Sequence, residues 1–457
     1  MNLRPPLPAC RTALAVALLC VAAGWPAAAR AACLDESAVE NTEPATPAAP
    51  ADPTDPRRTL QAMVREALER SQQVGASRLL AQAALDDVQE TAAARRIQAS
   101  MSLGAGPGGT QSLAGSETSA LQLRSAINIS QLLYDGGRQD RLVDWRGMQA
   151  ESARLGHITV SEQIALNTVS LALERSRYRQ HVVVYGQYVR KMACLLEALE
   201  TIVRADRGRA SELVQARKNL QQAELAQSQA VSQARQVEVR LRRLVGDGLP
   251  GTQGLATMFL QVPPLDQLMP EVEQSSEIAA LAAQAQAADR YAQAVAAGTR
   301  PQVSWSMTGS HAVGGGGSIG STRNSNYAVG VAVNIPLLNP GVAPATDAAR
   351  KRAQAAELQR ADALEARRYR AAEVHEQTIS SFDRARRVGG VLRESEQVRN
   401  FTLQQWQQLG RRSLFDVMGA EADHYNLRVA YVNALIDGQQ LNANLISLGR
   451  GVNEWLR

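Results

Sequence analysis

The chain has 457 residues with a formal net charge of +5, and only 4% of its residues are aromatic. A compact enzyme of this length fills its cores with more aromatic side chains, whereas long helices packed through Ala, Gln and Leu need fewer. The positive charge is spread along the chain without a basic block or an aromatic stacking platform, which argues against a nucleic-acid partner.

The first residues carry the features of a signal peptide, which we place at residues 1–31. Arg4 and Arg11 flank a short apolar run, and the small residues Ala29 and Ala31 suit a signal peptidase. The run is shorter than the roughly 20 residues that a transmembrane helix needs, and no later segment is long enough. We expect an exported protein without a transmembrane helix, with a flexible Pro- and Ala-rich segment at residues 32–56.

Two cysteines follow the expected signal peptide, Cys33 and Cys194. In an oxidising compartment they are candidates for a disulfide that ties the start of the chain to a helix. The alternative is lipidation of Cys33, although Arg30 occupies the position where an aliphatic residue is expected. The disulfide is the preferred interpretation.

Two pairs of alternating segments, at about 97–134 and 300–338, predict β-strands. From Tyr327 to Ile335, large apolar residues alternate with Ala, Gly and Asn, so one strand face is apolar and the other is small or polar. Segments of about ten residues cross a bilayer at a tilt, and faces of Ser, Thr, Asn, Gln and Gly suit a wet lumen. A half-buried sheet in a soluble domain is the alternative. Because the smallest such barrels have roughly eight strands, four strands predict a barrel shared between chains.

Long helical hairpins are predicted after each strand pair, at about 138–245 and 342–450. Residues 138–204 and 346–409 contain no proline, and each stretch would extend to roughly 100 Å as one helix. The returning helix after Gly208 repeats small and apolar residues every seven positions, which specifies coiled-coil packing. The two heptad sets are Leu213, Leu220, Gln227, Ala234, Leu241 and Ala216, Ala223, Ala230, Val237, Leu244. A plain coiled-coil rod would leave the attached strands unexplained.

The sequence indicates an internal duplication of a unit that consists of one helix, two strands and two further helices. Corresponding landmarks lie 204 residues apart, from Arg96 to Arg300 and from Gly137 to Gly341. This offset is far longer than the roughly 20–50 residues of a solenoid repeat. The sequence therefore predicts a first repeat at 57–245, a linker at 246–265 and a second repeat at 266–457.

No constellation of residues indicates an enzyme, a metal site or a cofactor site. Residues 104–109 match a Gly-rich dinucleotide fingerprint in their letters only, because no helix follows them. We expect this stretch to be a loop between two paired strands. The five histidines lack ligand spacing, and no nucleophile stands beside a base. We expect neither catalytic residues nor a cofactor.

Four stretches resemble the TolC family of outer-membrane efflux and secretion channels, over about residues 57–457. They are 131–138 and 333–341 after the strands, and 206–213 and 410–418 at the helix-hairpin tips. The resemblance implies a duplicated α+β membrane protein that forms a homotrimer. It implies a 12-stranded β-barrel in the lipid of the outer membrane, continued by a 12-helix α-barrel tunnel in the periplasm.

The resemblance also implies that the chain is a passive exit duct of a tripartite export system. Such ducts dock a periplasmic adaptor protein and an inner-membrane transporter. The first tip resembles most the branch that serves type I secretion of large proteins such as adhesins, with an ABC transporter. The alternative is the outer-membrane component of a proton-driven efflux pump for small molecules such as drugs or metals.

The family closes its tunnel at the hairpin tips, and this implies roles for matching residues. Asp416 matches a ring aspartate, and Glu212, Ser211 and Arg412 match residues that tie the hairpins together. Gly419 and Gln407 depart from the family at a second ring aspartate and a tying tyrosine. An ordinary solvated charged face is the alternative interpretation of the gate residues. The residues expected to dock the adaptor are Asp206, Arg207, Gly208, Gly410 and Arg411.

Overall fold

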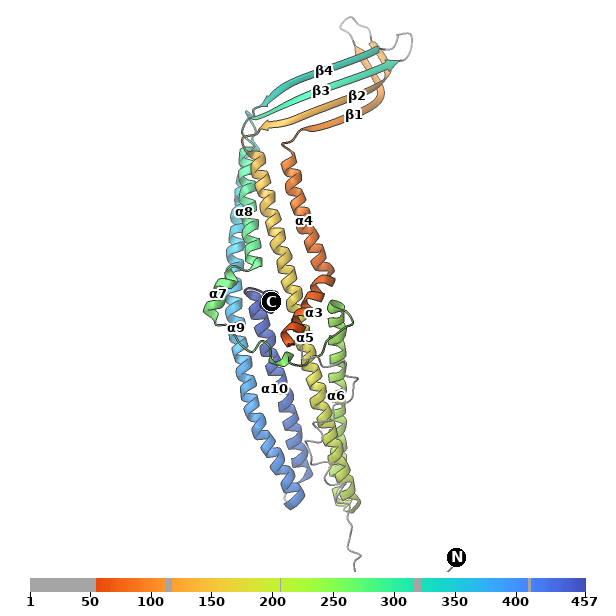
Figure 1. Cartoon of the computed structure of the whole chain (residues 1–457), viewed down its shortest axis with the longest axis vertical. Coiled ribbons are helices and arrows are strands. Elements are labelled where there is room, and N and C mark those ends of the chain that lie inside the picture. Colours follow the sequence, from red (N-terminus) through yellow and green to blue (C-terminus); the bar gives the residue numbers. More distant parts are fainter. Residues whose placement is uncertain (1–54, 112–116, 206, 316–321, 410–411) are drawn as a thin grey trace, which may run out of the picture.

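The computed structural model describes residues 55–457 except 112–116, 206, 316–321 and 410–411. The expected signal peptide, Cys33 and three of the expected docking residues (Asp206, Gly410 and Arg411) lie outside the described residues. The molecule is elongated, with all four strands gathered at one end and the helices running away from them (Figure 1). No helix among the described residues combines the length and the apolar character that a membrane crossing requires.

The strands form one antiparallel sheet in the order β1-β2-β3-β4. Their bounds are Gln98–Gln111 for β1, Glu117–Tyr134 for β2, Gln302–Gly315 for β3 and Thr322–Asn334 for β4. The strands are 13 to 18 residues long, longer than the ten or so expected. The Gly-rich stretch at 104–109, expected to be a loop, is part of β1, because it continues the ladder with β2.

The helices follow the predicted order twice. Helices α3 (Pro56–Arg70) and α4 (Gln72–Ala93) precede the first strand pair, and α7 (Leu265–Glu273) and α8 (Ser276–Ala297) precede the second. The long helices α5 (Arg138–Ala205) and α9 (Val342–Leu409) both have 68 residues. The returning helices α6 (Ala210–Val245) and α10 (Leu414–Leu448) have 36 and 35 residues. The short elements η1 (Arg207–Arg209), η2 (Leu255–Thr257) and α11 (Val452–Leu456) complete the chain.

Two equivalent corners turn the strands into the long helices. At the first, Gly136 and Gly137 have φ of 66° and 81°, where L side chains are strained. The carboxylate of Asp135 accepts from the backbone N–H groups of Gly137 and Gln139, at 3.1 and 2.6 Å. At the second corner, Asn339 Oδ1 accepts from the backbone N–H of Gly341 at 3.1 Å. The same device at both corners explains why the two sequence motifs lie at the offset of the duplication.

The coiled-coil prediction for α6 is confirmed. The second heptad set is buried at Ala216, Ala223, Ala230 and Val237, and these residues face α5. Their small side chains allow α5 and α6 to approach closely. We call this contact the α5–α6 seam.

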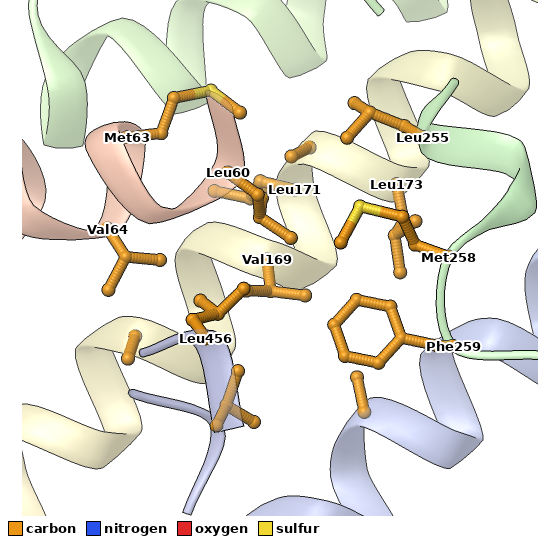
Figure 2. Packing of buried hydrophobic residues seen from close by; sticks show 14 of the residues in the cluster. Leu60, Met63, Val64, Val169, Leu171, Leu173, Leu255, Met258, Phe259 and Leu456 are labelled. Carbon is orange, nitrogen blue, oxygen red and sulfur yellow. The ribbon is translucent and has the colours of Figure 1, made fainter. Parts of the chain in front are cut away.

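The main hydrophobic core lies at the middle of the molecule, where α5 meets α3, η2, α10 and α11 (Figure 2). Leu60, Val169 and Leu173 are completely buried in it. Phe259 has a φ of 53°, a costly conformation for a residue other than glycine. Its ring stacks on Trp455 with centroids 4.4 Å apart, and its carbonyl accepts from Asn442 Nδ2 at 2.7 Å. These contacts hold the strained linker against the helices.

Candidate functional site

The strand register gathers the large apolar side chains on one face of the sheet. Ala99, Ile129, Met307 and Val329 stand directly opposite one another across the four strands. The neighbouring row brings Met101 and Ile127 together with Tyr327, whose side chain is 87% exposed. Soluble monomers rarely leave an apolar patch of this extent open to water. We call it the apolar face, and an apolar surrounding is the environment that it suits.

The opposite face of the sheet carries small and polar side chains in every strand. One row across it consists of Ser100, Asn128, Thr308 and Ala328. We call it the polar face. A sheet with one apolar and one polar face, both uncovered by helices in Figure 1, matches the wall of a water-filled barrel.

The two outer strands have open edges. Within the described residues, β1 pairs only with β2, and β4 pairs only with β3. Backbone N–H and C=O groups on such an edge need partners when the strand lies in lipid. In lipid, the sheet would therefore need further strands at both edges.

Helix α5 makes a second contact, with α10, that differs from the α5–α6 seam. Lys191 Nζ lies 3.6 Å from Glu421 Oε1, and Arg177 Nη2 lies 2.5 Å from Asp437 Oδ1. Gln440 Nε2 donates to the backbone carbonyl of Ser170 at 3.1 Å. We call this line of contacts the α5–α10 polar seam.

Glu421 is fully buried in the α5–α10 polar seam. A second cation, Arg399 of α9, places Nη1 3.8 Å from Glu421 Oε2 and is also buried. The carboxylate therefore joins α5, α9 and α10 at one point. The sequence analysis missed this cluster, although Leu414, Met418, Glu421 and Tyr425 follow heptad spacing with a charge at one inward position.

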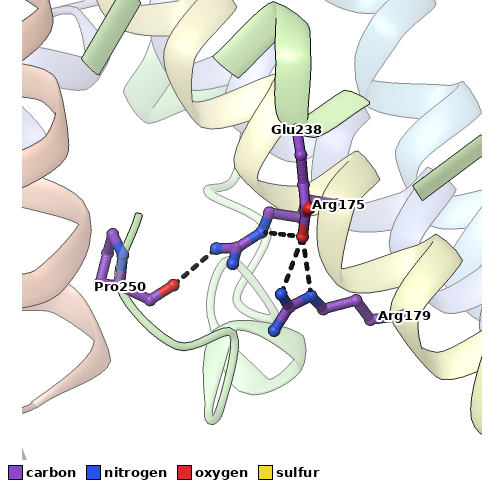
Figure 3. Close-up of polar contacts among 4 residues, drawn as sticks. All are labelled: Arg175, Arg179, Glu238 and Pro250. Carbon is purple, nitrogen blue, oxygen red and sulfur yellow. Dashed lines mark hydrogen bonds and ion pairs between the residues drawn. The ribbon is translucent and has the colours of Figure 1, made fainter. Parts of the chain in front are cut away.

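A buried arginine also ties the first hairpin to the linker (Figure 3). Arg175 donates to Glu238 Oε1 at 3.2 Å and to the carbonyl of Pro250 at 2.6 Å. Arg179 donates to the same Glu238 oxygen at 2.8 Å. Burial tends to raise the pKa of Glu238, but the hydrogen bonds from Arg179 and Arg175 outweigh it, so the pKa is lowered overall. Glu238 is thus held as a carboxylate.

The expected gate residues of the second tip lie at the start of α10. Ser413 and Asp416 form a capping box: Ser413 Oγ accepts from the backbone N–H of Asp416, and Asp416 Oδ2 accepts from that of Ser413. Arg412 Nε donates to Gln405 Oε1 at 3.1 Å, and Arg412 Nη1 lies 4.0 Å from Asp416. Asp416, which is expected to line the gate of the tunnel, therefore also caps the N-terminus of α10.

At the first tip, Glu212 pairs with Arg209 on the same hairpin at 3.4 Å. Ser211 is exposed one residue earlier, and Gly208 lies in η1, which also begins with Arg207. Among the described residues of one chain, the structure does not bring Arg412 and Glu212 into an ion pair, because each has a partner on its own hairpin. The expected tie between these two residues stays a prediction.

Cys194 of α5 is disulfide-bonded. Since Cys33 lies outside the described residues, the pairing of Cys33 with Cys194 stays a prediction.

The fold matches solved membrane channels over most of the chain. CusC, which forms a transmembrane channel, is 17% identical with a TM-score of 0.75, over 86% of this chain and 92% of CusC. VceC, an outer membrane protein of Vibrio cholerae, is 19% identical with a TM-score of 0.73, over 86% of this chain and 96% of VceC.

The outer membrane channel MtrE of Neisseria gonorrhoeae, solved in an open state, is 15% identical with a TM-score of 0.70, over 86% of this chain and 90% of MtrE. No protein-family model matches the sequence, and neither does any curated protein. The likeness to these channels is therefore one of fold.

Proposed function

We propose, from the fold that this chain shares with the TolC family of outer-membrane channels, that it is itself an outer-membrane channel with a helical tunnel in the periplasm. The observation that carries the proposal is the sheet, whose register sorts apolar and polar side chains onto opposite faces. The apolar face would contact lipid, and the polar face would line a lumen. The long helices α5 and α9 would continue that lumen away from the membrane.

The open edges of β1 and β4 support a homotrimer. Four strands are too few to close around a lumen, whereas three chains would contribute twelve, a number within the range of known barrels. Each edge would then find a partner in the next chain, and every backbone group in the membrane would be paired.

Light scattering of the detergent-extracted protein tests the assembly. We expect the mass of three chains, with channels of uniform conductance when the protein is placed in planar bilayers. A monodisperse monomer with intact β-sheet circular dichroism would contradict the proposal, because an open four-stranded sheet would then be stable on its own.

The hairpin tips are proposed as the gate, with Asp416, Arg412, Glu212 and Ser211 at the constriction. Asp416→Asn removes the charge while its amide oxygen can still accept the capping hydrogen bond of α10. We expect weaker cation preference and weaker block by multivalent cations, because a carboxylate ring concentrates cations. Ser413→Ala is the matched control, since it removes one capping hydrogen bond without changing charge. Unchanged selectivity in Asp416→Asn would place the constriction elsewhere.

Arg412→Ser tests whether an ion pair between chains restrains the gate. An exposed pair is worth only about 0–1 kcal/mol, but a trimer would repeat it three times. We expect a larger single-channel conductance at an unchanged melting temperature. Conductance equal to that of the parent would argue against a tie through Arg412.

The chain is proposed to be a passive conduit without a cofactor, joined to a periplasmic adaptor through its hairpin tips. Type I secretion of a large protein such as an adhesin, with an ABC transporter, is the leading assignment, and it rests on the sequence of the first tip. Efflux of small molecules with a proton-driven pump is the alternative. Crosslinking in cells from Gly208, followed by mass spectrometry of the adaptor and its transporter, distinguishes the two assignments.

A further inference from the structure

Among the strand side chains that the structure describes, one ionisable side chain stands on the polar face of the sheet. Among the described side chains of the four strands, the positions of the polar face carry Ser, Thr, Asn, Gln, Gly, Ala and one Leu, together with Arg124 of β2. The other arginine of the described strand residues, Arg323 of β4, belongs to the row of Leu123 and Val313 and therefore lies on the apolar face. Arg124 is thus the one charged residue among the described side chains of the polar face.

The neighbours of Arg124 leave room for its side chain. Its row across the sheet consists of Gly104, Arg124, Ala312 and Asn324, so the two strands that flank it present the smallest side chains available. A Cβ placed on Gly104 would meet no atom within 4 Å. Arg124 can therefore project from the wall without pressing on an adjacent strand.

One neighbour orients the guanidinium group. Gln122 lies two residues earlier on the same face of β2, and its Oε1 accepts from Arg124 Nε at 3.0 Å and from Nη2 at 2.6 Å. Arg124 remains exposed, and a guanidinium group has five N–H donors in total. Gln122 thus holds the guanidinium group through Nε and Nη2, and the remaining N–H donors of Arg124 have no partner among the described strand residues and can contact a ligand.

We propose that Arg124 forms an anion-binding ring inside the barrel and that its ligands are multivalent anions such as polyphosphates. The inference rests on the proposed trimeric channel, in which the three copies of Arg124 stand at one level of the wall. A guanidinium fork matches the oxygens of a phosphate, and such charge-assisted contacts are stronger than neutral hydrogen bonds. Arginine keeps its charge at every physiological pH, so the ring is permanent.

The ring gives the channel two charged zones in series. Arg124 lies in the half of β2 farther from α5, whereas the Asp416 carboxylates lie at the far tips of the helices. An anion would be attracted in the barrel and opposed at the tips. The barrel part of the selectivity is therefore separable from the gate by mutation.

Arg124→Gln tests the ring, because glutamine removes the charge while retaining a polar side chain on the wall. Arg323→Gln is the matched control, which removes an arginine from the other face one strand pair away. Single channels of each variant are recorded in planar bilayers at 0.1 M KCl, with tripolyphosphate added to each chamber in turn. Reversal potentials are measured under a KCl gradient.

We expect tripolyphosphate to block the parent channel from the barrel side. The half-blocking concentration should rise about tenfold in Arg124→Gln, because the charge-assisted contacts are lost. The reversal potential of Arg124→Gln should shift toward cation selectivity. In 1 M KCl the difference should shrink, because the Debye length falls from about 10 Å to about 3 Å. Arg323→Gln should behave as the parent.

Equal block and equal selectivity in the parent and in Arg124→Gln would overturn the proposal, and so would an equal change in Arg323→Gln. Light scattering confirms that each variant keeps the mass of the parent assembly. If the parent itself forms no channels, the proposed function fails rather than the ring. If the parent conducts and Arg124→Gln does not differ, the ring alone fails.

Discussion

Helix α5 contacts α6 mainly through alanine, valine and leucine, whereas its contact with α10 adds lysine, arginine, carboxylate and amide side chains to the apolar side chains of the core. In the α5–α6 seam, Ala216, Ala223, Ala230 and Val237 are each at most 2% exposed. Ion pairs also join these two helices: the pair of Arg240 with Glu174 is partly exposed, whereas Arg175 is buried beside Glu238. In the α5–α10 polar seam, the carboxylate of Glu421 is completely buried beside the buried Arg399 of α9, although Asp437 is partly exposed.

The two seams differ in what they contribute: one mainly adds stability, and the other mainly sets the axial register of the two helices. Burial of apolar area stabilises a helix pair, and small residues that repeat along it allow several neighbouring registers. A buried ion pair contributes little net stability, because desolvation offsets the attraction, yet loss of one partner is costly. The first seam therefore holds a hairpin together, and the second fixes the position of α10 against α5.

The largest effect is expected from Glu421→Ala. This change leaves the positive charges of Lys191 and Arg399 buried without their carboxylate, which costs about 3–5 kcal/mol of unfolding free energy. Thermal unfolding of the solubilised protein measures the loss. The triple variant Lys191→Met, Arg399→Met and Glu421→Leu should recover most of it. A Glu421→Ala melting temperature equal to that of the parent would show that the cluster does not contribute as the structure indicates.

A smaller effect is expected from Ala223→Leu in the α5–α6 seam. The added side chain has no room beside α5, since Ala223 is 1% exposed, and overpacking costs about 1–3 kcal/mol. Gln222→Leu, on the exposed side of the same helix turn, is the control and should change stability little. Equal melting temperatures for the two variants would mean that the helices can move apart at this seam without penalty.

The α5–α10 polar seam is also expected to be sensitive to acid through His181. Burial, and then the charge of Arg177, lower the pKa of His181 below its ordinary value of 6.5, while a hydrogen bond with Asn433 acts in the opposite direction. The unfolded chain therefore binds a proton at a higher pH than the folded chain does. Stability is full above pH 6.5 and declines as the pH falls toward the folded pKa.

Melting temperatures between pH 7.5 and pH 5.5 test this expectation. His181→Gln should flatten the decline while leaving the α5–α6 seam unchanged. An identical decline in the parent and in His181→Gln would assign the acid sensitivity to other groups.

The smallest effect is expected from Arg179→Gln. Arg179 and Arg175 share Glu238, but the side chain of Arg179 is 46% exposed and that of Arg175 is 5% exposed. An exposed ion pair contributes about 0–1 kcal/mol, so Arg179→Gln should change the melting temperature very little. Arg175→Gln should cost more, because the carbonyl of Pro250 also loses its partner. A reversed order would show that exposure does not decide the contribution of these arginines.

Local patterns in the sequence predicted most of the fold. Alternation within 327–335 assigned the two faces of β4, and the absence of proline predicted α5 almost to its observed ends. Helix α9 begins at Val342, before the proline-free stretch 346–409, because Pro344 falls in the first turn, where its missing N–H is tolerated. Residue types and their spacing are enough to predict strand faces and helix ends, because both depend on residues that are neighbours along the chain.

Contacts between distant segments were not predictable in the same way. The row that joins Ile127 to Tyr327 depends on the register of three strands, which no single strand encodes. The partner of Glu421 is a lysine 230 positions earlier, in a different repeat. At the tips, the sequence identified Arg412 and Glu212 but not their partners on the same hairpin. Long side chains choose among several partners, and the backbone geometry decides which of them is within reach.

In the proposed trimer, the equal lengths of α5 and α9 would give six hairpins of nearly the same height, so the outline would approach sixfold symmetry. The α5–α10 polar seam, however, occurs once in each chain and three times in the ring. The mechanical symmetry of such a trimer would therefore be threefold, with three identical joints at which charged side chains as well as apolar ones must separate. We therefore expect a tube with three such joints to widen toward a triangular mouth rather than a round one.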